Sequence, residues 1–336
     1  MTFSRLLFFI LSAALLSPAS GIAFGKETQS GITRSLKGEF PQPPGQPVSG
    51  PGGTAYFHKD MRENVFSPGT GIEYRILYPA LPKAEKASVV IFLHGWSAVD
   101  PSYYGGWLRH LVLRGHIVIW LRYQEDLRTP PGRFTPNAAS ALRDAFSRLN
   151  QAGGPYPLPA MQNIAAAGHS MGGLIAMNLA AGYADYGLPP IRAVFCLQPA
   201  AGGYDDMMGD YSQIPSGTLL LIAGSEDDEA ANINLSRDLM EKASSAADVN
   251  HILIKSDARG VPALTAGHQL AIGNERGGLD ALDWYGVWKW FDGLTDLAFH
   301  QKNGEFALGD TEAQRHMGFW SDGVPVKEPV VTLRRR

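Results

Sequence analysis

The residue types best suited to catalysis lie in one short sequence, Gly-His-Ser-Met-Gly-Gly at residues 168–173. The pattern Gly-x-Ser-x-Gly is typical of a nucleophilic serine on a sharp turn from a strand to a helix. Residues 164–167 form a short apolar run that predicts a buried strand, and residues 174–184 have helical spacing. We therefore expect Ser170 to be a nucleophile held in a strained turn, where glycines avoid collisions. The alternative is a tight turn that happens to contain a serine.

A serine hydroxyl needs a base, and suitable partners follow Ser170 in the chain. His268 lies in a loop after the apolar run 250–255, and the sequence Ser-Glu-Asp-Asp at residues 225–228 follows the apolar run 218–224. A histidine can take the serine proton and return it to the leaving group, while an ionised carboxylate orients the imidazole. The candidate acids are Asp227, Glu226, Asp228, Asp206 and Asp210.

Strand and helix patterns alternate through the body of the chain. Strands are expected at residues 73–78, 87–93, 116–123, 164–167, 192–197, 218–224 and 250–255, the last of the sheet, and helices at residues 102–114, 135–149, 174–184, 230–242 and 279–299. This alternation predicts a mostly parallel sheet with helices on both faces. Ligands bind beyond the carboxyl ends of such strands. His94, Ser170, Asp227 and His268 all fall at those ends.

Four sequence segments make the chain resemble a secreted α/β-hydrolase over residues 73–299. They are Val-Ile-Phe-Leu-His-Gly ending at Gly95, the serine motif, Ala-Gly-Ser-Glu-Asp ending at Asp227, and Ala-Gly-His ending at His268. The chain looks most like the dienelactone hydrolase, chlorophyllase and cutinase-like branches. The resemblance implies the α/β-hydrolase fold and a Ser170, Asp227, His268 triad, because Gly-x-x-Asp after the same strand recurs in this family. It also implies an oxyanion hole made by the backbone N–H groups of Trp96 and Met171.

The expected activity is cleavage of carboxylic esters, of small-molecule or polymer substrates, through an acyl-enzyme. The connection at residues 198–217 has 20 residues, which leaves no room for a large cap domain. An open site favours short acyl chains, and Tyr103, Tyr104 and Trp107 are candidates for its wall, with burial in the core as the alternative. Other hypotheses are a lipase or cutinase-like enzyme, an acyltransferase or perhydrolase acting at the same site, and a hydrolase fold that binds without catalysing.

The composition is that of an ordinary globular protein, with 336 residues, 45% of them hydrophobic, and a formal charge of −3. This charge does not favour nucleic-acid binding, which usually requires a marked basic excess. Cys196 is the only cysteine and lies in an apolar run, so we expect a buried core residue rather than a catalytic thiol. The histidines form no His-x-x-x-His pair, and we expect neither a metal nor another cofactor.

The N-terminal residues predict export. Residues 1–23 combine one arginine, an apolar run of 11 residues at 6–16 and a stretch of small residues, as in a cleaved signal peptide. The run is too short for a membrane span, which needs about 20 residues. Residues 24–53 are rich in Gly and Pro and predict a flexible linker, with the catalytic domain at 54–336, including a short basic tail. We expect a secreted or periplasmic protein.

Overall fold

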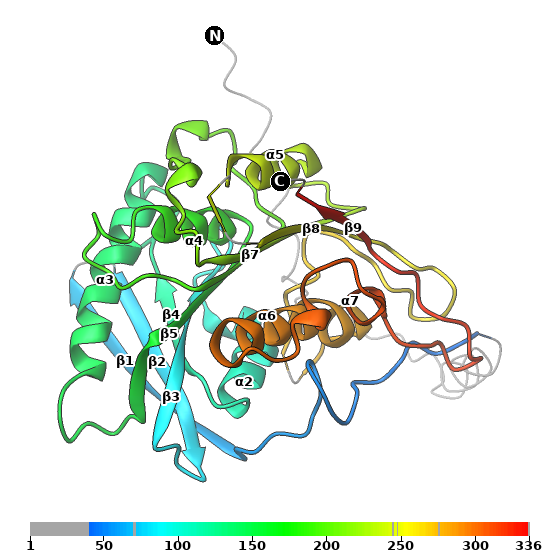
Figure 1. Cartoon of the computed structure of the whole chain (residues 1–336), viewed down its shortest axis with the longest axis horizontal. Helices are drawn as coiled ribbons and strands as arrows, with labels where there is room; N and C mark the ends of the chain where they lie inside the picture. The colour runs from blue at the N-terminus through cyan, green and yellow to red at the C-terminus, as the bar shows by residue number, and fades with distance from the viewer. Residues whose placement is uncertain (1–39, 70–71, 244, 247, 275, 335–336) are drawn as a thin grey trace, which may run out of the picture. The chain divides into compact units, whose positions relative to one another are not determined.

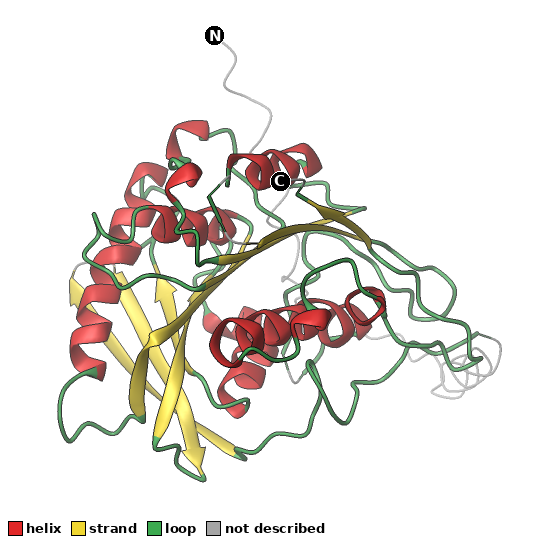
Figure 2. Ribbon diagram, in the orientation of Figure 1, coloured by secondary structure: helices red, strands yellow, loops and turns green. Residues whose placement is uncertain are grey.

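A nine-stranded sheet is the centre of the fold (Figures 1 and 2). The computed structural model describes residues 40–69, 72–243, 245–246, 248–274 and 276–334. The predicted signal peptide and the first part of the predicted linker lie outside the described residues.

The strands follow the order β1-β2-β4-β3-β5-β6-β7-β8-β9 across the sheet. Their bounds are β1 (Asp60–Gly69), β2 (Ile72–Leu81), β3 (Lys86–Leu93), β4 (Ile117–Arg122), β5 (Leu158–His169), β6 (Ala193–Leu197), β7 (Leu219–Ser225), β8 (Asp248–Ile254) and β9 (Val330–Leu333). The strands from β4 to β8 in this order pair in parallel, whereas β1, β2 and β9 join antiparallel at the two edges. The prediction of a mostly parallel sheet is confirmed.

Helices cover both faces of the sheet, as predicted (Figure 1). The helices are α2 (Gly105–Leu113), α3 (Phe134–Leu149), α4 (Met171–Ala181), α5 (Ile233–Lys242), α6 (Trp288–His300) and the short α7 (Glu312–Arg315). One buried cluster joins α3, α4 and α5 to one face, and a second joins α2 and α6 to the other. Helix α4 has no charged residue and is buried along residues 171–180, as expected for a helix covered on all sides. It fixes the position of the serine turn at its own N-terminus.

Residues 40–53, predicted as linker, are instead held against the catalytic domain, which begins at Phe40 rather than at residue 54. The Gln42 N–H donates to Ser321 Oγ at 2.9 Å, and the Gly52 N–H donates to the buried carboxylate of Asp292 at 2.8 Å. The Trp284 indole donates to the Pro44 carbonyl at 3.3 Å. This segment forms no helix or strand, so its hydrogen bonds go to distant parts of the chain, which local composition does not reveal.

The edges of the sheet also differ from the prediction. The expected last strand, β8, is followed by β9, which pairs antiparallel with it, and β1 precedes the first expected strand. Both additions are edge strands with many exposed residues, so they lack the apolar run that identifies buried parallel strands. The predicted helix 279–299 is a π-helical turn at Asp283–Val287 that continues into α6. Among the described residues, no helix has the length and apolar character needed to cross a membrane.

Candidate active site

Ser170 occupies the turn between β5 and α4 with φ 57° and ψ −123°. A positive φ is unfavourable for any residue with a side chain, so the surrounding structure must hold this conformation. The Ser170 N–H donates to the Leu197 carbonyl at 2.8 Å, and the Ser170 carbonyl accepts from the Gly173 N–H at 2.9 Å. The strained turn expected from the sequence is present.

The glycines on either side of Ser170 are required by the close approach of backbone segments. A Cβ at Gly168 would collide with the Gly172 carbonyl group, and a Cβ at Gly172 would collide with the carbonyls of Leu93 and His94. Backbone atoms cannot move aside as a flexible side chain could. The spacing Gly-x-Ser-x-Gly therefore allows β3, β5 and α4 to meet directly beneath the serine.

His268 links Ser170 to Asp228. Its Nε2 lies 3.0 Å from Ser170 Oγ, and its Nδ1 lies 2.9 Å from Asp228 Oδ2. Asp228 also accepts the backbone N–H groups of Ala230 at 2.9 Å and Ala231 at 2.7 Å. Burial would raise the pKa of Asp228, but the hydrogen bond and charge of His268 and these N–H groups lower it overall. An ionised Asp228 only accepts, so His268 carries its proton on Nδ1 and its Nε2 is free to accept the serine proton.

Asp227 does not contact His268, which corrects the choice made from sequence. Its exposed carboxylate accepts the Ser256 hydroxyl at 2.5 Å, and Glu226 forms an ion pair with Lys255 at 2.6 Å. Strand β7 continues through Ser225, so the following turn begins one residue later than the Gly-x-x-Asp spacing assumes. The alternative acid Asp210 caps the turn that contains Ser212, and Asp206 is exposed in the same connection.

The two expected oxyanion residues lie beside the serine turn. Met171 directly follows Ser170 as the first residue of α4, where helix N–H groups lack carbonyl partners within the helix. A Cβ at Gly95 would lie 3.4 Å from Ser170 Cβ, which places the loop containing Trp96 against the serine. A Cβ at Gly202 would lie 3.5 Å from the Trp96 ring and 3.7 Å from Met171 Cε. The side chains of Trp96 and Met171 thus converge on the connection after β6.

The aromatic residues near the site divide between core and surface. Tyr104 and Trp107 are buried in the core, so they do not wall a pocket, while Tyr103 is 47% exposed. The rings of Trp96 and Tyr204 lie edge to face with centroids 5.9 Å apart. Sequence reasoning missed Tyr204 because no strand or helix pattern marks the connection in which it lies.

Cys196 is buried in β6, as predicted, and burial raises the pKa of its thiol. His94 is also buried, and its Nδ1–H donates to the Gly95 carbonyl at 2.6 Å. Burial lowers the pKa of His94 to about 4, which keeps the imidazole neutral. Within the described ranges, no group of three or more His, Cys, Asp or Glu side chains is placed to hold a metal ion.

A mostly parallel sheet covered on both faces, with a serine turn between β5 and α4 and an Asp–His pair beyond the ends of later strands, defines the α/β-hydrolase fold. The chain therefore has the fold of this superfamily. Residues 64–212, fewer than half of the 336, match the family model described as chlorophyllase, one of the three branches that the sequence resembles, and this match supports a hydrolase activity of the esterase type. The matched residues include Trp96 and Ser170 and end before Asp228 and His268. No curated protein matches the chain.

Proposed function

We propose that the protein is a serine esterase that cleaves carboxylic esters through an acyl-enzyme, with Ser170, His268 and Asp228 as its triad. The observation that carries this proposal is the hydrogen-bonded sequence of Ser170 Oγ, His268 and Asp228, with distances of 3.0 and 2.9 Å. A hydroxyl is a weak nucleophile at neutral pH, and an adjacent imidazole whose other nitrogen is bound to a carboxylate is the arrangement that activates it.

In the acylation step, Ser170 Oγ attacks the ester carbonyl while His268 Nε2 takes the hydroxyl proton. Asp228 stabilises the resulting imidazolium. The negative charge on the carbonyl oxygen is stabilised by the backbone N–H groups of Met171 and Trp96, each typically contributing about 3 kcal/mol. His268 then returns the proton to the alkoxide, which leaves as the alcohol. In the second half, water attacks the acyl-enzyme with His268 as base, and the acid is released with Ser170 restored.

We propose short acyl groups as substrates because little structure covers the site. Between β6 and β7 the described chain forms only the short 3₁₀ turns Asp205–Met207 and Tyr211–Gln213. Trp96, Met171 and Tyr204 supply a small apolar wall, and Tyr204 is 37% exposed. Each methylene of the acyl chain that is buried against this wall contributes about 0.8 kcal/mol to binding, and methylenes that extend past it contribute nothing.

Labelling with a fluorophosphonate probe tests the triad directly. Wild-type protein should become labelled at Ser170, and Ser170→Ala should lose labelling and reduce ester hydrolysis by about 10⁴-fold while remaining folded. An unlabelled, folded wild type would indicate a hydrolase fold that only binds. Undiminished turnover by Ser170→Ala would mean that the active site lies elsewhere.

A series of nitrophenyl esters tests the substrate class. Catalytic efficiency should fall beyond acyl chains of about eight carbons, without a jump when the substrate forms micelles. An optimum at about twelve carbons with interfacial activation would contradict the open site and indicate a lipase. Adding alcohols or hydrogen peroxide shows whether water is the preferred acceptor, since an acyltransferase or perhydrolase would divert the acyl group to them.

We also propose that the protein is exported with removal of the signal peptide within residues 1–23. The short apolar run and the small residues that follow it support this proposal. Mass spectrometry of the protein recovered outside the cytoplasm should show an N-terminus between residues 20 and 25. Retention of residues 1–16 would contradict it.

A further inference from the structure

Two buried side chains bind consecutive backbone carbonyls at the triad histidine. His169 Nε2 lies 2.9 Å from the His268 carbonyl oxygen, and Gln198 Nε2 donates to the Gly267 carbonyl at 2.7 Å. His169 directly precedes Ser170, and Gln198 directly follows β6. The loop that carries His268 is therefore attached both to the serine turn and to the end of the neighbouring strand.

The same network reaches the oxyanion loop through Tyr104. The Gly95 N–H donates to the Tyr104 hydroxyl oxygen at 2.8 Å, and this oxygen lies 2.9 Å from His169 Nδ1. The two ends of this series of hydrogen bonds determine which atom donates at each step, because the Gly95 N–H can only donate and the His268 carbonyl can only accept. His169 must therefore carry its proton on Nε2, and the Tyr104 hydroxyl must donate to Nδ1. Burial, followed by the nearby His268, lowers the pKa of His169 to about 3, so the imidazole stays neutral.

Burial makes these hydrogen bonds costly to lose. Tyr104 and Gln198 are 0% exposed and His169 is 2% exposed. Gln198 also donates to Ser225 Oγ at 2.8 Å, and its backbone has φ 47°, a conformation that is unfavourable outside glycine. Strained residues persist where the surrounding structure holds them. Here that structure is formed by the carboxyl ends of the central strands beneath Ser170 and His268. A purely local turn would not require a glutamine that reaches two other elements.

We propose that Tyr104, His169 and Gln198 are positioning residues that hold the His268 loop and the Gly95–Trp96 loop in fixed positions around Ser170. The proposal rests on the serine esterase function above. None of the three touches the reacting atoms; they act through the backbone of His268 and of Gly95. Displacement of a catalytic group by about 1 Å can lower the rate by about 100-fold, so their loss should reduce kcat while KM changes little.

Two substitutions of His169 separate the roles of its nitrogens. In His169→Gln the amide nitrogen occupies the place of Nε2 and can still donate to the His268 carbonyl. In His169→Asn the shorter amide reaches only the place of Nδ1, and the carbonyl loses its donor. We expect His169→Asn to lower kcat by about 10- to 100-fold and His169→Gln to recover most of that loss. Gln198→Glu, which replaces the amide donor with a carboxylate, should lower kcat similarly.

Tyr211→Phe is the matched control, because Tyr211 is buried and its hydroxyl donates to Asn178 at 3.1 Å, outside this network. Tyr211→Phe should lose about as much stability as His169→Asn, while its kcat is unchanged. A proton NMR resonance of His268 Nδ1–H, bound to Asp228, reports on the triad itself and should shift or broaden in His169→Asn but not in Tyr211→Phe.

The outcomes distinguish this inference from the proposed function. A folded wild type that fluorophosphonate does not label would overturn both. A labelled wild type with a folded His169→Asn whose kcat is within about twofold of wild type would overturn the positioning role alone. If His169→Asn does not fold, Tyr104→Phe decides by the same criterion, since it removes only the hydroxyl between Gly95 and His169.

Discussion

Asp228 shows how one carboxylate is distinguished from two acidic neighbours. Its side chain is 2% exposed, and it accepts one imidazole N–H and two backbone N–H groups. These donors stabilise the charged form despite burial. Asp227 is exposed and bound to a serine hydroxyl, and Glu226 pairs with a lysine. Of the three, only Asp228 contacts the His268 imidazole.

Asparagine substitutions of the two aspartates should therefore have unequal effects. Asp228→Asn should reduce kcat/KM by about 10⁴-fold, because an amide can hold His268 in the wrong tautomer. Asp227→Asn should change it by less than about threefold, since an exposed hydrogen bond contributes little. Steady-state hydrolysis of a short nitrophenyl ester measures both. A severe loss in Asp227→Asn with an active Asp228→Asn would show that the loop rearranges in solution.

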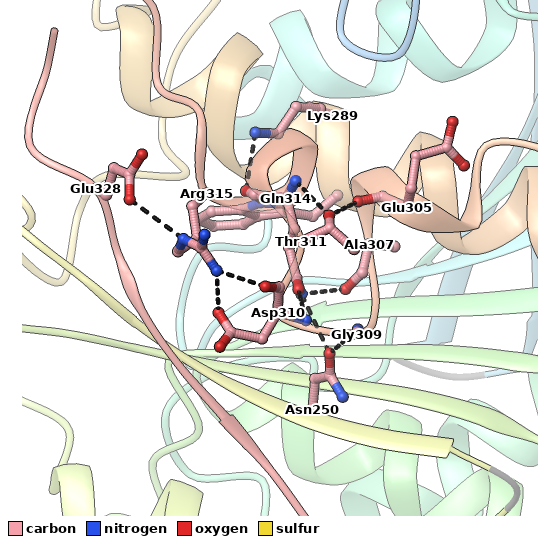
Figure 3. Close-up of polar contacts among 11 residues, drawn as sticks. Asn250, Lys289, Glu305, Ala307, Gly309, Asp310, Thr311, Gln314, Arg315 and Glu328 are labelled. Atoms are coloured by element: carbon pink, nitrogen blue, oxygen red, sulfur yellow. Dashed lines mark hydrogen bonds and ion pairs between the residues drawn. The ribbon is translucent and has the colours of Figure 1, made fainter.

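At the scale of elements, polar contacts attach the segment that follows α6, residues 305–328, to α6 and β8 (Figure 3). The Lys289 ammonium, on α6, donates to the carbonyls of Ala313 and Gln314 at 3.0 Å and of His316 at 2.6 Å. The Gln314 side chain donates to Asn250 of β8 at 3.3 Å. The lysine thus satisfies carbonyls at the end of α7 that have no partner within so short a helix.

Lys289→Met should leave the partly buried carbonyls of Ala313 and His316 without this donor, whereas the Gln314 carbonyl still accepts from the Trp290 indole at 2.9 Å. We expect the free energy of unfolding to fall by about 1–3 kcal/mol, while ester hydrolysis is unchanged. Urea denaturation followed by fluorescence measures the difference. Lys302→Met, at an exposed position near the same segment, is the control and should have a much smaller effect. Equal stability of the two variants would show that the three hydrogen bonds add nothing net.

At the scale of the whole molecule, four buried histidines make stability depend on pH. Burial is the main cause that lowers the pKa of His94, His116 and His251 to about 4 and of His169 to about 3. The unfolded chain binds protons at these positions near pH 6.5, whereas the folded chain binds them only near pH 4 or below. Between those values the unfolded state holds more protons, so stability rises with pH.

The free energy of unfolding should accordingly be constant above pH 6.5 with respect to these groups and decline as the pH falls towards 4. Each group can contribute up to about 3 kcal/mol to this decline. Denaturation curves at several pH values measure it. His251→Gln, in β8, should flatten the decline relative to the exposed control His300→Gln. Identical slopes for the two variants would contradict the assignment to buried histidines.

The sequence by itself determined the parallel sheet, its covering helices and the position of Ser170. These features depend on local patterns: apolar runs for buried strands, helical spacing, and glycines where backbone segments touch. The order of Ser170, an acidic cluster and His268 along the chain also indicated the class of enzyme. Residues 40–53 were misassigned because their partners, such as Asp292, are distant in sequence.

Only the tertiary structure decided which acid faces His268 and what holds that histidine. The choice between Asp227 and Asp228 depends on where β7 ends, and its pairing with β8 sets that point. Gln198 and Tyr104 carry no motif, and their roles exist only because β3, β5 and β6 end side by side beneath the His268 loop. A shift of one residue reverses the direction of a side chain, so composition and spacing could locate the acidic cluster but not the carboxylate that binds the imidazole.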